Sequence, residues 1–220
     1  MPVLNETLSL RRCLGSLYLS ENEELIIVDG GSSDNTAEAA REFTPKVFEA
    51  KTGRASVMNF GAGKAAGDIL LFLHADCVLP KGAFSRIRET LNDSDVAAGA
   101  FALGIDHHGM GFRLIETAAN IRSRLTSLMY GDQGMFLRKE VFDHIGGFAE
   151  IPLMEDIEIS KRLKKEGRIV FIDPPIKASP RRWLKEGMLY TTLRDWAIAF
   201  LYTFFKISPQ RLIKHYKEVR

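Results

Sequence analysis

The stretch LIIVDGGSSDNTAEAAREF, residues 25–43, joins an apolar run to a helical segment through a turn of glycine and short polar residues. A short apolar run bounded by turn residues is typical of a buried strand. Asp34 or Asn35 can cap the helix that follows, because a short side-chain acceptor satisfies its free N–H groups. The same alternation continues to about residue 105. Strands that alternate with helices indicate parallel βαβ units, so the first half predicts a doubly wound α/β layer.

The remaining elements follow from the apolar pattern along the chain. Two helices are expected between Leu184 and Tyr216, with a break near Ser208 and Pro209. No linker, repeat or low-complexity segment divides the chain, so one structural unit is expected. The other strands are expected at 46–50, 69–74, 96–105, 132–138 and 168–173, and the other helices at 53–67, 81–92, 111–128, 139–145 and 155–167.

The composition is that of an ordinary soluble globular protein, with 45% apolar and 26% charged residues among 220. A net charge of +2 without a long basic run gives no basis for a nucleic-acid partner. Cys13 and Cys77 lack a metal-ligand spacing and indicate a reducing, cytoplasmic location, although a disulfide between them is left open. Residues 1–6 do not resemble a signal peptide. The aromatic-rich run 196–205 is shorter than the about 20 residues that span a bilayer.

Polar residues follow two of the expected strands at the point where each strand ends. Asp29 and Gly30 follow the run 25–28, and His74 and Asp76 follow the buried run 69–73. Parallel α/β sheets bind ligands beyond the carboxyl ends of their strands, so two strands bring acids to one edge of the sheet. Each acid taken alone is better explained as a loop residue or a helix cap. The pair together favours a functional site.

Three other segments carry weaker signals. The run GAGKAAG, residues 61–67, is not a phosphate-binding P-loop, because Met58 and Ala65 stand where that motif needs glycine and serine or threonine. The acids of MEDIEIS, residues 154–160, suit the first turn of a helix by complementing its dipole, which is worth about 0.3–1 kcal/mol each. The arginines of SPRRWLKEG, residues 179–187, suit phosphate by charge and forked geometry, although surface arginines are common.

Taken together and in this order, these pieces resemble the family 2 glycosyltransferases. The likeness covers roughly residues 2–185 and depends on the ordered set of motifs, since any one of them is only suggestive. The matching stretches are PVLNE (2–6), LIIVDGGSSDNT (25–36), GRASVMNFGAGKAAGDILLFLHADCVLP (53–80), GDQGMFLRKEVFDHIGGF (131–148), MEDIEISKRL (154–163) and RRW (181–183).

The resemblance implies the A-type glycosyltransferase fold, a Rossmann-like, three-layer α/β fold with a mixed, mainly parallel central sheet. The glycosyltransferase domain would cover 1–185, and 186–220 would form a C-terminal helical extension packed on it. The implied enzyme is a transferase of the hexosyltransferase class. It would move a sugar from a nucleotide-diphospho-sugar donor, a UDP- or GDP-sugar, to the hydroxyl of an unidentified acceptor, with a divalent cation, Mg²⁺ or Mn²⁺.

The resemblance also implies roles for individual residues. The Asp-x-Asp element of the family falls on 74–76, and its last acid, Asp76, would bind the metal. Arg181, Arg182 and Trp183 would lie near the diphosphate or the acceptor. The nucleotide would be held by residues at matching positions: Pro2, Leu4, Glu6, Asp29, Gly30, Arg54, Asn59 and His74.

This pattern fits the chemistry of sugar transfer. Breaking the glycosidic bond develops negative charge on the departing diphosphate, and a cation held by a hard oxygen ligand such as Asp76 lowers that cost. The acceptor hydroxyl needs a proton acceptor, for which Asp156 is the first choice and Glu155 the second. A base opposite the leaving group implies single displacement with inversion. His74 departs from the usual first acid; it would favour Mn²⁺ as a softer ligand, contact the ribose, or bind nothing.

Two regions depart from the family pattern. Members carry an apolar strand before the segment matching 2–6, whereas only Met1 precedes it here, so we expect either an upstream start or another segment in that place. The second region is the aromatic-rich run with the basic tail 206–220. Its residues suit either an amphipathic helix packed on the sheet or a peripheral contact with the inner face of the membrane, which would favour a lipid-linked acceptor.

Two rival functions are kept. A sugar-phosphate nucleotidyltransferase also combines an α/β nucleotide fold with metal-binding carboxylates. It would usually show an early glycine-rich loop with a basic residue, and residues 2–6 and those after them show none. A non-catalytic nucleotide-sugar-binding protein on the same fold is the other rival. The absent first strand and His74 are the features that favour it.

Overall fold

Two sheets form the centre of the protein in this computed structural model, which describes residues 1–50 and 53–216. Among these residues the first sheet has the strand order β1-β2-β3 and the second has the order β4-β7-β6-β8-β5. The strands are β1 (Pro2–Val3), β2 (Ile27–Asp29), β3 (Val47–Glu49), β4 (Ile69–Phe72), β5 (Cys77–Val78), β6 (Val96–Ile105), β7 (Met135–Arg138) and β8 (Arg168–Ala178).

Strand direction differs between the two sheets. The first sheet is parallel throughout. In the described part of the second sheet only β6 and β8 pair in parallel, while β4·β7, β6·β7 and β5·β8 are antiparallel. The expectation of a mixed α/β sheet is confirmed, but mainly parallel pairing is wrong for this sheet, because β7 lies between β4 and β6 and runs opposite to both.

The central strand β6 explains why the core has two sides. All ten of its residues are buried, as its continuous apolar sequence VAAGAFALGI predicts for a strand covered on both faces. Ala98 and Ala100 face a cluster with α3 (Arg54–Lys64), α6 (Lys139–His144) and α7 (Glu155–Glu166). Phe101 and Leu103 face a cluster with α4 (Ala83–Leu91) and α5 (Met110–Thr126). The sheet is therefore the middle layer between two helical layers.

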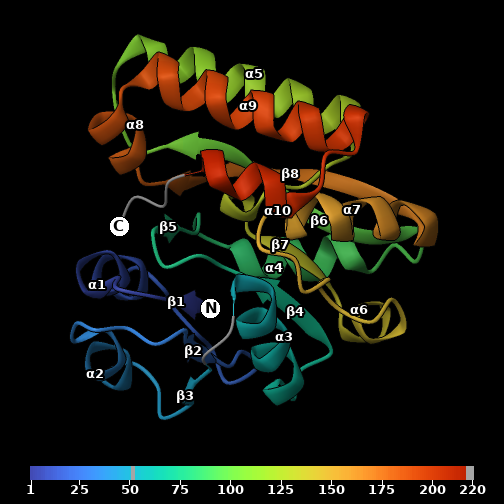
Figure 1. Cartoon of the computed structure of the whole chain (residues 1–220). Helices are drawn as coiled ribbons and strands as arrows, with labels where there is room; N and C mark the ends of the chain where they lie inside the picture. The colour runs from blue at the N-terminus through green and yellow to red at the C-terminus, as the bar shows by residue number, and fades with distance from the viewer. Residues whose placement is uncertain (51–52, 217–220) are drawn as a thin grey trace.

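Helices occupy the expected segments, together with α1 (Thr7–Gly15), which was not expected, and surround both sheets (Figure 1). Helix α5 lies against β6 and β8, and α9 lies beside α5. The helices are α1 (Thr7–Gly15), α2 (Thr36–Arg41), α3 (Arg54–Lys64), α4 (Ala83–Leu91), α5 (Met110–Thr126), α6 (Lys139–His144), α7 (Glu155–Glu166), α8 (Arg181–Glu186), α9 (Met188–Phe205) and α10 (Pro209–Leu212), with short 3₁₀ turns η1 (Gly131–Gln133) and η2 (Ile213–His215).

The N-terminal strand β1 is short, and the amine of Met1 before it is buried. Strand β1 pairs with β2, and the Met1 amine donates a hydrogen bond to the carbonyl of Ile26 at 2.8 Å. Burial lowers the pKa of this amine to about 5. Among the described strands β4 pairs only with β7, and an apolar cavity of about 370 Å³ is lined by both β2 and β4. The two sheets are therefore not hydrogen-bonded to each other.

The segment after 185 packs on the rest of the chain. Ile198 and Ala199 of α9 are buried against Leu153, Ile157 and neighbouring residues. Cys13 and Cys77 are both buried and free of a disulfide. Within the described residues, no helix combines the length and the apolar character needed to cross a membrane.

Candidate active site

Two adjoining cavities lie at the ends of β1, β4, β7 and β8. The larger cavity has a volume of about 400 Å³ and is lined by the residues around Pro2, Glu6 and Gly30. The smaller cavity has a volume of about 210 Å³ and is lined by residues of α5, α7 and α9. The two cavities share the lining residues Arg54, His74, Asp76, Leu153, Arg181, Arg182 and Tyr216, which therefore form the boundary between them.

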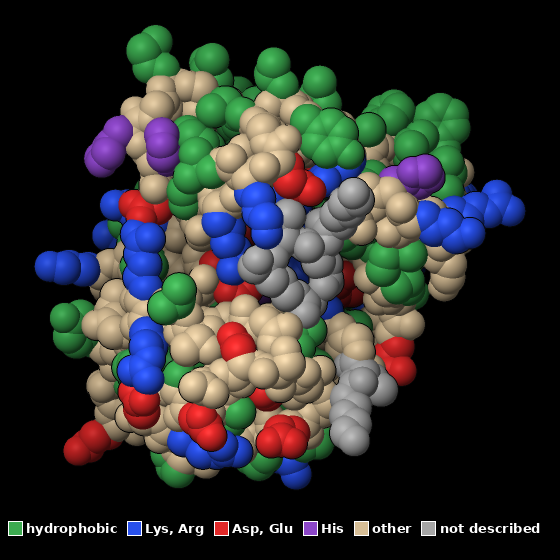
Figure 2. Space-filling model, turned by 60° about the vertical axis from the view of Figure 1, so that its left-hand side comes forward, with side chains coloured by type: hydrophobic (Ala, Val, Ile, Leu, Met, Phe, Trp, Pro, Cys, Tyr) green, Lys and Arg blue, Asp and Glu red, His purple; other side chains and the backbone are tan. Residues whose placement is uncertain are grey.

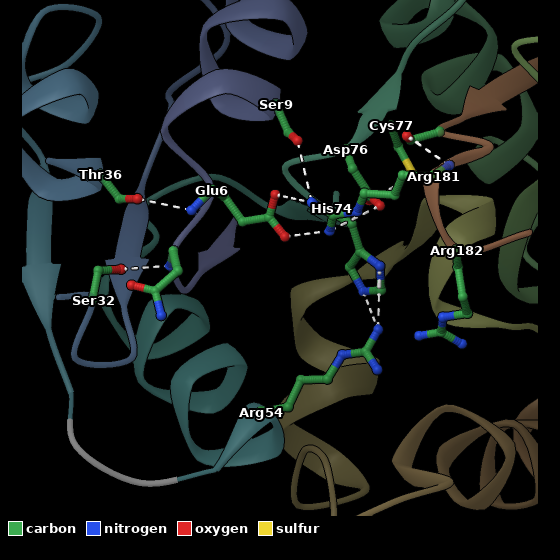
Figure 3. Close-up of polar contacts among 12 residues, drawn as sticks. Glu6, Ser9, Ser32, Thr36, Arg54, His74, Asp76, Cys77, Arg181 and Arg182 are labelled. Carbon is green, nitrogen blue, oxygen red and sulfur yellow. Dashed lines mark hydrogen bonds and ion pairs between the residues drawn. The ribbon is translucent and has the colours of Figure 1, made fainter. Parts of the chain in front are cut away.

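Arg181 holds two acids together at this boundary (Figure 3). Its Nη1 donates to Oε2 of Glu6 at 2.6 Å, and its Nη2 donates to the other carboxylate oxygen. The same Nη2 lies 3.3 Å from Oδ2 of Asp76. Burial would lower the pKa of Arg181, but the hydrogen bonds to Glu6 and the charge of Asp76 raise it overall. Arg181 thus links the N-terminal segment to the turn between β4 and β5.

Arg54 and His74 form a second contact at the boundary. Nη2 of Arg54 lies 2.9 Å from Nε2 of His74, and Nε of Arg54 lies 3.3 Å from Oε1 of the buried Glu155. Burial and the nearby arginine charge hold the pKa of His74 well below its usual range, so the ring is neutral and accepts from Arg54. Gly131 packs on this pair, since a Cβ there would lie 2.5 Å from the imidazole Cε1.

Asp156 lies in the first turn of α7, where Met154 adopts a left-handed conformation, φ 69°, that begins the helix. Its Oδ2 accepts from the backbone N–H of Gly131 at 2.9 Å, and its Oδ1 accepts from the N–H of Ile157 at 2.8 Å. Asp156 and Asp76 both line the smaller cavity. The two aspartates singled out in the sequence therefore face a single cavity, although they are eighty residues apart.

Most other expected residues line these cavities. The larger cavity is lined by Pro2, Leu4, Glu6 and Gly30. Trp183 lines the smaller cavity, where its Nε1 donates to Thr192. Arg182 stands at the boundary and donates to Asp195 at 3.0 Å and to the hydroxyl of Tyr216.

Asp29 and Asn59 are not among the described residues that line either cavity. Asp29 is 3% exposed, and its Oδ1 accepts from the N–H groups of Gly31 and Ser32, so it shapes the loop behind Gly30. Asn59 exchanges two hydrogen bonds of 2.8 Å with the backbone of Phe148 and joins α3 to the loop after α6. Both positions support the site from behind its surface.

The structure adds residues to the site that the sequence did not single out. The smaller cavity is also lined by Arg122 of α5, by Tyr130 and Asp132 at η1, and by Trp196 of α9. Tyr216 reaches both cavities from the C-terminal segment. Burial raises the pKa of Asp132 to about 6, with Arg122 acting in the opposite direction and Asp156 and Asp76 adding to the rise. The only available signal for Asp132 was its place in the matched segment 131–148.

The described residues contain no cluster of three or more histidine, cysteine or acidic side chains that could enclose a metal ion. Mg²⁺ is commonly bound through one or two carboxylates together with substrate phosphates. Asp76 is a single carboxylate at the boundary between the two cavities. It fits a cation that is held jointly with a diphosphate. His74 is already in contact with Arg54, so Asp76 is the better protein ligand of the two.

The fold is that of the A-type glycosyltransferases. The family model for glycosyl transferase family 2 matches residues 1–149. The chain belongs to glycosyl transferase family 2.

Individual relatives agree with this placement. Glycosyltransferase AglE of Haloferax volcanii is 24% identical over 200 residues, which cover 83% of this chain and 66% of that protein. The probable glycosyltransferase YdaM of Bacillus subtilis is 24% identical over 260 residues, which cover 97% of this chain and 59% of that protein. This chain thus spans about two thirds or less of the length of these relatives.

Solved structures share the fold. The mannosyltransferase PcManGT from Pyrobaculum calidifontis, in complex with GDP-Man and Mn²⁺, matches with a TM-score of 0.71 and 16% identity over 97% of this chain and 66% of that chain. Glucosyl-3-phosphoglycerate synthase from Mycobacterium tuberculosis, in complex with Mn²⁺ and UDP-glucose, matches with a TM-score of 0.57 and 18% identity over 91% and 76%.

Proposed function

We propose that this protein transfers a sugar from a nucleoside diphosphate sugar to an acceptor hydroxyl, by a single displacement that inverts the anomeric carbon. The observation that carries this proposal is the shared cavity of Asp76 and Asp156, with Arg54, Arg181 and Arg182 at its boundary. Family membership supports a glycosyltransferase over a nucleotidyltransferase. The solved neighbours that contain GDP-Man, UDP-Glc and Mn²⁺ support the donor class and a divalent cation.

In this proposal the sugar donor occupies the larger cavity, the donor cavity, and the acceptor enters the smaller one, the acceptor cavity. The backbone around Gly30 and the side chains of Pro2 and Leu4 form the wall against which the base and ribose pack. The diphosphate lies at the boundary, where Arg181 and Arg182 exchange part of their contacts with Glu6, Asp76 and Asp195 for phosphate oxygens. Guanidinium groups suit this exchange because their forked geometry matches phosphate as well as carboxylate.

Charge that develops on the leaving diphosphate is stabilised by the arginines and at Asp76. Asp76 would hold Mg²⁺ or Mn²⁺, which would supply Lewis-acid stabilisation of that charge. Arg54 lies between His74 and Glu155, so its guanidinium is held in one orientation toward the boundary. Neutral His74 thus orients Arg54 without adding positive charge of its own.

Asp156 is the proposed proton acceptor, because its carboxylate is held by the N–H of Gly131 and lines the acceptor cavity. Glu155 is less suited to this role: it is 2% exposed and lies against Arg54. Attack from the acceptor cavity on a sugar whose diphosphate leaves toward the donor cavity gives inversion. NMR of the initial product checks the configuration, and a retained anomer contradicts single displacement.

Binding and turnover test the proposal separately. With Mn²⁺ present, GDP or UDP should raise the melting temperature of the protein, because a ligand bound only by the folded state stabilises it. Asp76→Ala should remove the Mn²⁺-dependent part of this rise. Asp156→Asn should keep it but lower sugar transfer by about 10²–10⁴-fold, the usual contribution of a general base.

Asp143→Asn, at an exposed position on α6, is the control that should change neither binding nor transfer. No stabilisation by any nucleoside diphosphate would contradict the proposed function as a whole. Full transfer by Asp156→Asn would remove only the role of that residue.

We also propose that the outer face of α5 and α9 contacts an anionic membrane surface. Hydrophobic side chains gather along this edge of the molecule (Figure 2). Both helices expose large apolar residues with the same spacing: Met110, Leu114, Ile121 and Leu125 on α5, and Leu189, Leu193, Phe200 and Phe204 on α9.

The charges around this apolar face favour anionic lipid. In the described part of the chain, the exposed charged side chains of α5 and of 184–216 are all basic: Arg113, Arg124, Lys185, Lys206, Arg211 and Lys214. Apolar residues that insert at the headgroup level, surrounded by bases, are the features of an interfacial membrane contact. The inner faces of the same two helices line the acceptor cavity.

A further inference from the structure

Arg122 is a cation of the acceptor cavity that has no acidic partner among the described residues. It lines this cavity from α5, and its Nε is buried without a hydrogen-bond acceptor. Within the same part of the chain its side chain forms no hydrogen bond and no ion pair. The other arginines of the cavity are all paired: Arg54 with Glu155, Arg181 with Glu6 and Asp76, and Arg182 with Asp195.

Two aromatic rings fix the orientation of Arg122. The guanidinium carbon lies 3.8 Å from the ring centre of Tyr130 and 5.1 Å from that of Trp196. Stacking on ring faces stabilises the cation through the ring quadrupole, but it uses only the faces of the planar group. The N–H groups point outward in the plane of the guanidinium. Nε is sealed from solvent, whereas Nη1 and Nη2 are not and form no hydrogen bond among the described residues, so these two groups are left for an anion. A planar fork of this kind recognises carboxylate and phosphate by two parallel hydrogen bonds.

The Nε–H group of Arg122 is buried without an acceptor, which costs free energy. The ring faces stabilise the positive charge, but they supply no hydrogen-bond acceptor for Nη1 and Nη2. Asp132 acts on Arg122 through space, but within the described structure it lies beyond the distance of an ion pair. The position of Arg122 therefore suits binding of a ligand group better than it suits stabilisation of the fold.

We propose that the smaller cavity is the acceptor site, and that Arg122 binds a carboxylate or phosphate group that the acceptor carries close to its reacting hydroxyl. This inference rests on the proposed sugar transfer and specifies the class of acceptor. The volume of about 210 Å³ is below the about 300–1,000 Å³ of sites for drug-sized ligands, so the cavity admits a small acceptor or the head group of a larger one.

The proposed anion site agrees with the position of the base. Tyr130, on which Arg122 stacks, is followed directly by Gly131, whose N–H holds Asp156. An acceptor anchored by its anion on Arg122 therefore presents a neighbouring hydroxyl toward the turn that carries the proton acceptor. Arg122 acts as a binding and positioning residue, and the proton moves from the hydroxyl to Asp156 as the new glycosidic bond forms and the diphosphate leaves.

The test measures anion binding after the donor site has been filled. The protein is saturated with GDP or UDP and Mn²⁺, and inorganic phosphate is then titrated at constant ionic strength while the melting temperature is followed. Phosphate should stabilise the wild-type protein, and Arg122→Gln should weaken its apparent affinity at least ten-fold. Arg122→Lys, which keeps the charge but loses the fork, should fall between them.

Arg168→Gln is the matched control, because Arg168 is an exposed arginine that is paired with Asp93 and lines neither cavity. It should bind phosphate like the wild-type protein. Equal stabilisation of wild type and Arg122→Gln, or no stabilisation of wild type, would overturn the anion site. If nucleoside diphosphate with Mn²⁺ does not stabilise the wild-type protein, the proposed function itself fails, so the two failures are distinguishable.

Competition identifies the source of the anion. Displacement of phosphate by glycerol phosphate, but not by glycerol, supports a soluble anionic acceptor. Displacement only by vesicles of phosphatidylglycerol, and not by those of phosphatidylcholine, supports a lipid headgroup. Displacement by glycerol or phosphatidylcholine as effective as by their anionic counterparts would contradict recognition of the anion.

Discussion

At the scale of single residues, the acceptor cavity combines charges that neutralise one another only in part. Asp132 lies near Asp76 and Asp156, and burial together with these acids raises its pKa from 3.8 to about 6. Asp132 therefore binds a proton more readily in the folded protein than in the unfolded chain. Stability from this group falls as the pH rises from about 4 to 6, and the cost is fully present above that range.

We therefore expect Asp132→Asn to stabilise the fold at pH 7.5. A shift of about two pKa units corresponds to a gain of at most about 3 kcal/mol, since one unit is worth about 1.4 kcal/mol. The gain should shrink toward zero as the pH falls below about 4, where Asp132 becomes protonated in both the folded and the unfolded chain. Denaturant unfolding between pH 4 and 7.5 measures it. A gain that does not depend on pH would show that the carboxylate charge is not its cause.

At the scale of elements, the fit between β6 and β7 depends on one glycine. Gly99 of β6 stands opposite Phe136 of β7, and a Cβ at this position would lie 2.6 Å from Cε2 of that ring. Phe136 is fully buried and contacts Phe101 edge to face at 5.9 Å between ring centres. The ring cannot move without displacing the core on that side of the sheet.

Gly99→Ala should accordingly destabilise the fold by about 1–3 kcal/mol, the usual cost of overpacking a core. Gly63→Ala is the matched control, because Gly63 lies in α3 with no atom within 4 Å of the added Cβ. That change should stabilise the fold by about 0.5–1 kcal/mol through the lower entropy of the unfolded chain. Thermal unfolding of both variants measures this, and equal melting temperatures would contradict the packing argument.

At the scale of the whole molecule, α5 and α9 form a layer with two uses. Their inner faces line the acceptor cavity and their outer faces carry the exposed apolar rows. A layer one helix thick thus separates the proposed membrane contact from the site of sugar transfer. An acceptor at a membrane surface would have a short path to Asp156.

Flotation with vesicles tests the membrane contact. The protein should float with anionic vesicles, less so at high salt, because attraction between bases and anionic lipid is screened. The double variant Leu125→Glu/Phe204→Glu should lose binding, since it places acids on both exposed rows. Leu8→Glu changes an equally exposed leucine on α1 and should bind like the wild-type protein. Flotation of the double variant at the wild-type level would contradict the proposed face.

The sequence by itself determined the elements and the order of the motifs. The apolar runs placed β4 and β6, and the polar residues at strand ends marked Asp76 and Gly30, because periodicity and turn chemistry are local properties of a chain. The family followed from the same ordered motifs. The expected role of Asn59 depended on its matched position alone, and that of Asp29 also on its place at the end of a strand. Nothing local distinguishes a residue that lines a cavity from one that supports it.

Only the tertiary structure decided which distant residues meet. Strand direction in the second sheet, the shared cavity of Asp76 and Asp156, the arrival of Tyr216 at the boundary and the stacking of Arg122 on Tyr130 and Trp196 all arise from how separate elements pack. The position of β7 between β4 and β6 sets the strand directions in this part of the second sheet. Such contacts depend on the packing of whole elements, and the pattern within any one segment carries no information about its partner.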